Sequence, residues 1–270
     1  MEANPTAESL LAEEREKTWA LVPDLSVFDV FLYTNDYHNL KAAIKLVCTG
    51  SEDFGLFISH GTIDHRELLH AVQERDWGSL PDPMRGPAEE AYTALAQTRD
   101  GQLCDIILDR AALDAVYAAG KASRDELVRR YAELTVAAAD IKTAVRCART
   151  GKPMDFIRRA LAECDSLSVS RLAKAAAEGL DSICDLLSTT DYADAVEVLR
   201  QSPSAFERWC DNLIIRYIRP QQFQSFGIGP LAAYILGREN EIKSVRIILS
   251  GKLNQLSDQS IRERVREMYV

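Results

Sequence analysis

Acidic side chains whose spacing could bind a metal ion lie in one short segment of the chain. Asp105 and Asp109 are four residues apart, which places both carboxylates on one face of a helix, and Asp114 follows. Such oxygen donors suit a divalent cation. Pairs at this spacing are also common on the solvated faces of helices, and no matching acidic cluster stands elsewhere. Of the functions considered for this chain, a helical metal-dependent enzyme built on Asp105 and Asp109 is therefore the least favoured.

The histidines and the glycine–lysine pairs do not match catalytic or phosphate-binding motifs. The four histidines are His38, His60, His65 and His70. His65 and His70 are about 140° apart around a helix, so they diverge, and solvated polar positions are their expected role. Gly151-Lys152 and Gly251-Lys252 lack the upstream glycine of a phosphate-binding loop, and no Gly-x-Ser-x-Gly elbow is present. The sequence predicts no catalytic residue, no metal and no cofactor.

The composition is that of an ordinary globular protein. The chain has 270 residues and a net charge of −9, with 47% hydrophobic and 27% charged residues. The acidic balance argues against nucleic-acid binding, and no apolar run is long enough to cross a membrane. The N-terminus lacks the basic and apolar regions of a signal peptide. Six scattered cysteines without a Cys-x-x-Cys pair indicate reduced, buried thiols in a cytosolic protein.

A motif that occurs three times carries a regularly spaced lysine. The copies are residues 39–50 (NLKAAIKLVCTG), 140–151 (DIKTAVRCARTG) and 241–251 (EIKSVRIILSG). The lysines Lys41, Lys142 and Lys243 are 101 residues apart, since 142 − 41 and 243 − 142 both equal 101. A fixed internal period indicates a repeat architecture. Apolar residues three and four apart predict that each copy forms the end of an amphipathic helix.

Each copy is followed by signals that end one helix and begin another. Gly50, Gly151 and Gly251 close the three copies, and a glycine in the left-handed conformation can end a helix there. After each glycine, a second pattern occurs: an apolar residue, then an Asp or Ser, then three variable positions and a Leu or Ile. Asp64, Ser168 and Ser257 are the N-caps that this pattern predicts, and the flanking apolar residues resemble a hydrophobic staple.

The repeated basic residues have two possible roles. They can form a solvent-facing stripe, or ion pairs to the adjacent Asp140 and Glu241. Alternatively, Lys41, Lys142 and Lys243 are three equivalent contact points around a pseudo-threefold axis.

The chain as a whole is predicted to be all-α, because alternating apolar runs are short and alanine is abundant. The repeats indicate three similar helical lobes, residues 1–85, 86–188 and 189–270. Residues 77–87, rich in proline and glycine, are the expected linker after the first lobe, and residues 188–191 form a softer boundary.

Three segments resemble one known family. Residues 34–41 (TNDYHNLK), 229–234 (GPLAAY) and 239–246 (ENEIKSVR) are similar to hallmarks of the C subunit of the archaeal and bacterial V/A-type ATPases. The eukaryotic counterpart is the d subunit. The resemblance runs from about residue 25 to the C-terminus, and the threefold motif makes it specific.

The resemblance implies a fold and a function. The three lobes would form a funnel-like body around a pseudo-threefold axis, without an active site. Compared with family members, the first lobe would be short at its N-terminus. Such a protein would lie at the cytoplasmic face of the membrane, cap the proteolipid ring and receive the D and F subunits of the central stalk. It would thus couple rotation between ATP synthesis or hydrolysis and proton or sodium transport. A free-standing helical-repeat adaptor is the alternative function.

Overall fold

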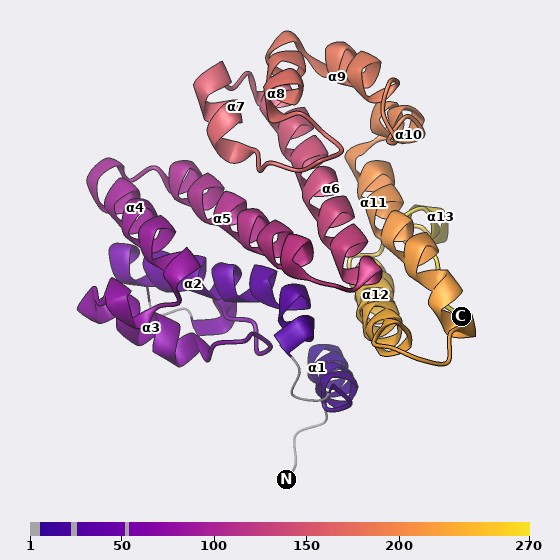
Figure 1. The fold of residues 1–270 in the computed structure, drawn as a ribbon, viewed down its shortest axis with the longest axis horizontal. Helices are drawn as coiled ribbons and strands as arrows, with labels where there is room; N and C mark the ends of the chain where they lie inside the picture. Colours follow the sequence, from indigo (N-terminus) through magenta and orange to yellow (C-terminus); the bar gives the residue numbers. More distant parts are fainter. Residues whose placement is uncertain (1–5, 23–25, 52–53) are drawn as a thin grey trace. The chain divides into compact units, whose positions relative to one another are not determined.

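The computed structural model describes residues 6–22, 26–51 and 54–270, and helices are its regular structure (Figure 1). No strand occurs among these residues, which confirms the all-α prediction. The N-terminal residues Met1 to Pro5, where a signal peptide was not expected, lie outside the described part. The described chain forms two compact units, residues 26–186 (the middle unit) and residues 1–25 with 187–270 (the terminal unit).

The middle unit contains most of the helices. They are η1 (Ser26–Phe31), α2 (Tyr33–Thr49), η2 (Phe54–Leu56), α3 (His65–Glu74), η3 (Trp77–Ser79), α4 (Asp82–Thr98), α5 (Gly101–Ala122), α6 (Glu126–Thr150), α7 (Met154–Ala160), α8 (Val169–Glu178) and all but the last residue of α9 (Leu180–Leu187). The terminal unit contains α1 (Ala7–Trp19), α10 (Ala195–Gln201), α11 (Pro203–Ile218), η4 (Arg219–Phe223), α12 (Gly229–Leu253) and α13 (Asp258–Arg262).

Helix α5 organises the middle unit, because it packs against α2, α4 and α6 (Figure 1). Leu40 and Ile44 of α2 and Leu108 of α5 are fully buried in one apolar cluster. Small residues such as Ala88 and Ala112 share that cluster and allow the helices to approach closely. Farther along the chain, α8 packs on both α6 and α7.

In the terminal unit, charged side chains join α1 to α12. Arg15 of α1 donates two hydrogen bonds to the carboxylate of Glu239, from Nε at 2.8 Å and from Nη2 at 2.5 Å. The indole N–H of Trp19 donates to the same carboxylate at 2.8 Å. A bidentate arginine–carboxylate pair fixes orientation as well as distance. These partly buried contacts therefore hold α1 along α12.

The expected linker at residues 77–87 is largely helical, so this prediction is wrong. Helix α4 begins at Asp82, with Pro83 in its first turn, where the missing N–H is not needed. Pro87 lies inside the helix and cannot donate to the carbonyl of Pro83. The hydroxyl of Tyr37 donates to that carbonyl instead, at 3.2 Å. A tertiary hydrogen bond thus compensates for a residue that by itself indicates a break.

The division into three lobes stays a prediction. The second expected boundary, after residue 188, lies close to the start of the terminal unit's second segment at Leu187. The first, after residue 85, falls inside α4, and α4 packs on both α2 and α5.

Candidate functional site

The repeated motif lies on three long helices, and the helix that follows each has the predicted cap. The motif copies end α2 and α6 and lie in α12. The side chains of Asp64, Ser168 and Ser257 accept hydrogen bonds from the first turns of α3, α8 and α13. The later apolar residue of the pattern is buried in each copy: Leu68, Leu172 and Ile261. Each capped helix packs against its long helix, so the repeat predicted from the sequence is a repeat of packing as well.

Gly50 and Gly151 lie immediately after α2 and α6 in the left-handed conformation. Their φ angles are 66° and 63°. The amide of Gly50 donates to the carbonyl of Leu46 at 2.9 Å. At the end of α6, the backbone amide of Lys152 donates to the carbonyl of Cys147 at 3.0 Å. This is the hydrogen bond of a Schellman motif that spans more residues. Both glycines satisfy carbonyls that the helix end leaves free.

The third expected stop is wrong, because Gly251 lies inside α12 and is buried. The helix ends one turn later, where Gln255 has a φ of 56°. Leu256 donates to the carbonyl of Gly251 at 2.9 Å, so the Schellman geometry forms around glutamine. The glycine serves packing instead: a Cβ at residue 251 would lie 2.6 Å from Cγ1 of Ile261 in α13.

The first of the three repeated lysines is bound to the acidic pair of α5. Lys41 Nζ lies 2.6 Å from Asp109 Oδ1, and Lys45 Nζ lies 2.5 Å from Asp105 Oδ1. The two carboxylates therefore tie α5 to α2. In the described part of the chain, no three His, Cys, Asp or Glu side chains are grouped as metal ligands.

The other two lysines differ from each other. Lys243 of α12 lies 2.5 Å from Asp211 of α11, and the buried Arg266 also contacts Asp211, at 2.7 Å. Lys142 of α6 is half-buried, and no ion pair is recorded for it among the described residues. The ion pairs expected with Asp140 and Glu241 do not form: Asp140 is buried on another face, and Glu241 pairs with Arg238.

The structure adds a set of buried polar anchors that the sequence patterns did not identify. Asn39 of α2 both accepts from the amide of Ile58, at 2.8 Å, and donates to its carbonyl, at 3.0 Å. Asp140 of α6 accepts from the amide of Ala162 at 3.1 Å. Asn240 of α12 donates to the carbonyl of Glu267 at 2.8 Å. Each long helix thus holds the backbone of a segment that returns to it. A signal was available, since each polar residue lies two or three positions before a repeated lysine.

Burial changes the acidity of two buried carboxyl groups. Burial raises the pKa of Asp140 to about 8, and the hydrogen bond from Ala162 opposes the rise. Burial also raises the pKa of Asp36, which accepts hydrogen bonds from the hydroxyl and the amide of Thr62 at 2.7 and 2.8 Å. Asp140 is thus a carboxyl that keeps its proton at neutral pH.

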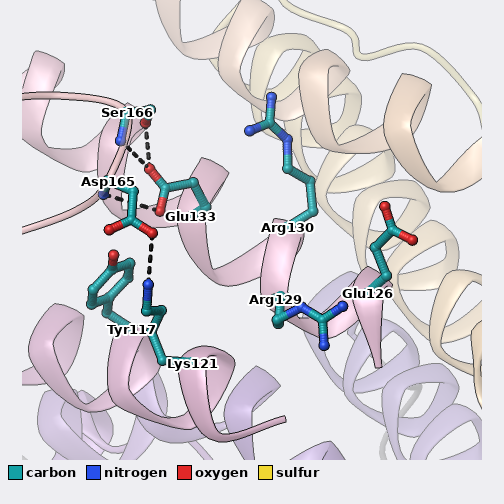
Figure 2. A pocket seen from close by; sticks show the side chains of 8 residues that line it. All are labelled: Tyr117, Lys121, Glu126, Arg129, Arg130, Glu133, Asp165 and Ser166. Atoms are coloured by element: carbon teal, nitrogen blue, oxygen red, sulfur yellow. Dashed lines mark hydrogen bonds and ion pairs between the residues drawn. The ribbon is translucent and has the colours of Figure 1, made fainter. Parts of the chain in front are cut away.

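A polar pocket of about 440 Å³ lies in the middle unit, between α5, α6 and the segment before α8 (Figure 2). It is lined by Tyr117, Lys121, Glu126, Arg129, Arg130, Glu133, Asp165 and Ser166. The nearly buried Glu133 accepts hydrogen bonds from the hydroxyl and the amide of Ser166, the latter at 2.7 Å. Lys121 and Asp165 pair at 2.7 Å. The lining holds three cationic and three carboxylate side chains, so its formal charge balances.

Tyr117 and Arg130 line the pocket in different ways. Burial and the neighbouring Asp165 carboxylate raise the pKa of Tyr117, so its hydroxyl stays protonated. In Figure 2, Arg130 extends away from the network that joins Lys121, Asp165 and Glu133. It is half-buried, with no ion pair recorded in the described part of the chain. Arg129 and Arg130 were not singled out from the sequence, because they follow no repeated motif.

The chain is similar to C subunits of V-type and A-type enzymes over most of its length. It is 24% identical to the C subunit of the V-type sodium ATPase of Enterococcus hirae. The alignment of 274 residues covers 97% of this chain and 82% of the relative. The chain is 23% identical to the C subunit of the V-type ATP synthase of Thermus thermophilus, over 87% of this chain and 73% of the relative. The C subunit of the A-type ATP synthase of Methanocaldococcus jannaschii is also 23% identical, over 87% of this chain and 64% of the relative.

Among the described residues, no helix is both long and apolar enough to span a bilayer. The model of one family, the ATP synthase (C/AC39) subunit, matches residues 7–264 of this chain. The chain therefore belongs to the ATP synthase (C/AC39) subunit family.

Proposed function

We propose that this protein is the non-catalytic rotor coupling subunit of a V/A-type ATPase. It joins the D and F subunits of the central stalk to the proteolipid ring at the cytoplasmic face of the membrane. The observation that carries the proposal is the family match over residues 7–264. The relatives are named as subunits of V-type and A-type enzymes, one of them a sodium ATPase. The transported ion is a proton or sodium.

The build of the long helices supports a role in transmitting torque. Helices α6 and α12 each have 25 residues, which corresponds to about 37 Å. Asp125 caps the start of α6 through the amides of Leu127 and Val128, and Gly151 closes its end. Buried anchors then fix the returning segments to these helices. Within each unit, a long helix anchored this way resists bending, as a rotating coupler requires.

Lys142 is our candidate for the stalk contact among the three repeated lysines. Lys41 and Lys243 neutralise Asp109 and Asp211 within the protein, so their charges already serve the fold. Lys142 has no such recorded partner in the described part of the chain and remains available for a carboxylate of a partner protein. An ion pair at a partly exposed interface weakens as salt increases.

Retention of purified partners tests the function directly. The full chain, immobilised by a tag, is expected to retain the cognate D–F complex and the detergent-solubilised ring at low salt, and to hydrolyse no ATP alone. Lys142→Glu is expected to weaken D–F binding. The matched control is Arg149→Glu, an exposed change on the same helix with the same charge difference.

The alternative, a free-standing adaptor, predicts the opposite result. If the wild-type chain retains neither the D–F complex nor the ring, the rotor assignment is wrong. If both are retained but Lys142→Glu and Arg149→Glu behave alike, the function stands and the assignment of Lys142 is wrong.

A further inference from the structure

Two phenylalanines in the terminal unit are almost completely exposed. Phe223 ends η4 and is 83% exposed, and Phe226 follows three residues later with 91% exposed. They lie in residues 221–228, which comprise the end of η4 and the orange segment that joins it to α12 in Figure 1. We name these residues the phenylalanine loop. Single exposed apolar residues are common, but two phenylalanines this exposed in one short loop indicate an interaction site.

The loop is held in place by the elements on either side. Arg219 donates to the carbonyl of Met268 at 2.8 Å and lies 3.5 Å from Glu267. The side-chain amide of Gln221 lies against the backbone of Gly229, at the position that a Cβ would take. Pro230 then starts α12 in its first turn. The two phenylalanine side chains are therefore presented by an anchored loop.

The loop and the first turns of α12 carry no charged residue. From Pro220 to Gly237 there is no Asp, Glu, Lys, Arg or His, although charged residues make up 27% of the chain. The polar members of the loop are glutamine and serine. Burying this surface against an apolar partner would therefore not remove water from any charged side chain.

We propose that the phenylalanine loop is the docking surface for an apolar protein surface at the edge of a membrane. This proposal rests on the proposed function, in which that partner is the proteolipid ring. Proteins that span a membrane present apolar helices, and their cytoplasmic loops carry an excess of lysine and arginine. The loop suits the apolar part, and the net charge of −9 suits the basic part.

A protein partner fits better than the bilayer itself. A weak hydrophobic insertion needs a second signal, usually a basic patch facing anionic lipid. Arg216 and Arg219 are the basic residues before the loop, and Glu267 lies near both. The acidic chain would also be repelled by an anionic surface. Lipid alone therefore offers less binding than the ring.

The test compares two surface variants with the wild type in binding to the detergent-solubilised ring. Phe223→Ser with Phe226→Ser is expected to weaken ring binding on the order of ten- to a hundredfold, because two large apolar contacts are lost. D–F binding is expected to stay unchanged. Leu253→Ser is the matched control, since Leu253 is 80% exposed in the same unit. Phe223→Leu with Phe226→Leu is expected to restore most of the binding.

A second measurement does not depend on how the serine variants fold. A photo-crosslinking amino acid at position 226 of the full chain is expected to couple to a protein of the ring in the assembled complex. Equal ring binding by the wild type and the double serine variant, or crosslinking only to lipid or to D and F, would overturn the proposal. So would loop-dependent binding to protein-free vesicles that matches the binding to the ring.

The outcomes also separate this proposal from the function on which it rests. A wild-type chain that retains neither ring nor D–F complex refutes both. A chain that retains both partners, with ring binding indifferent to the loop, refutes the loop assignment and leaves the rotor role intact.

Discussion

Asp140 and Asn39 perform the same task in two copies of the repeat with different chemistry. Asn39 offers an amide that both accepts and donates to the backbone of Ile58. Asp140 accepts from Ala162 through one oxygen, and its other oxygen is buried without a recorded hydrogen bond among the described residues. A neutral amide suits this environment at any pH, whereas a carboxyl suits it only while it carries a proton.

Asp140 is therefore expected to make stability depend on pH. Its folded pKa of about 8 lies above the ordinary value of 3.8, so the folded state holds a proton that the unfolded state loses. Stability is fully present below about pH 4 and falls as pH rises towards 8, by at most about 1.4 kcal/mol per pH unit. Asp140→Asn should remove this slope. Chemical denaturation at pH 5.5, 7 and 8.5 measures it, and parallel curves for both proteins would refute the assignment.

The glycines of the repeat are expected to respond to substitution for different reasons. Gly151→Val should cost on the order of 1–2 kcal/mol, because valine is strained at a φ of 63°. Gly151→Asn should cost less, because asparagine tolerates that conformation. Gly251→Ala should cost about 1–3 kcal/mol through overlap with Ile261, without backbone strain. Melting temperatures check all three, and a harmless Gly251→Ala would contradict the packing role.

At the scale of elements, the sequence predicts what depends on neighbours in the chain. The N-caps at Asp64, Ser168 and Ser257 form because a short polar side chain bonds to amides of its own next turn. The segment 77–87 was predicted wrongly because a tertiary contact, from Tyr37 to Pro83, decides it. The anchors were missed for the same reason: loops of different length bring their partners back to the helix.

Asn39 is expected to stabilise the segment before α3 more than α2 itself. Asn39→Ala would leave an N–H and a carbonyl of Ile58 without partners, at a cost of about 1–3 kcal/mol. Hydrogen exchange of residues 55–62 should accelerate, while the amides in the centre of α2 stay protected. Thr49→Ala, an exposed change on the same helix, should alter stability by less than about 0.5 kcal/mol. Equal exchange in both variants would show that the anchor does not hold this segment.

At the scale of the whole molecule, sequence period and compactness divide the chain differently. The 101-residue spacing predicts three lobes, since each copy carries the same helix, stop and cap. The structure groups the first two copies into one compact unit, because α5 packs against both α2 and α6. A period in the sequence identifies the repeated element, whereas independent folding depends on which segments share one hydrophobic core.

Excision distinguishes the two divisions. Residues 26–186 alone are expected to unfold in one cooperative transition, because their apolar cluster is complete without the rest of the chain. Residues 86–188 alone lack α2 and the start of α4, so Leu108 and Ala112 of α5 would face water. This shorter fragment should be less helical and bind dyes that recognise exposed apolar surface. Circular dichroism and urea denaturation of both fragments measure the difference. If the shorter fragment folds as cooperatively as the longer one, the lobe is the folding unit and the grouping of the first two copies is only a matter of packing.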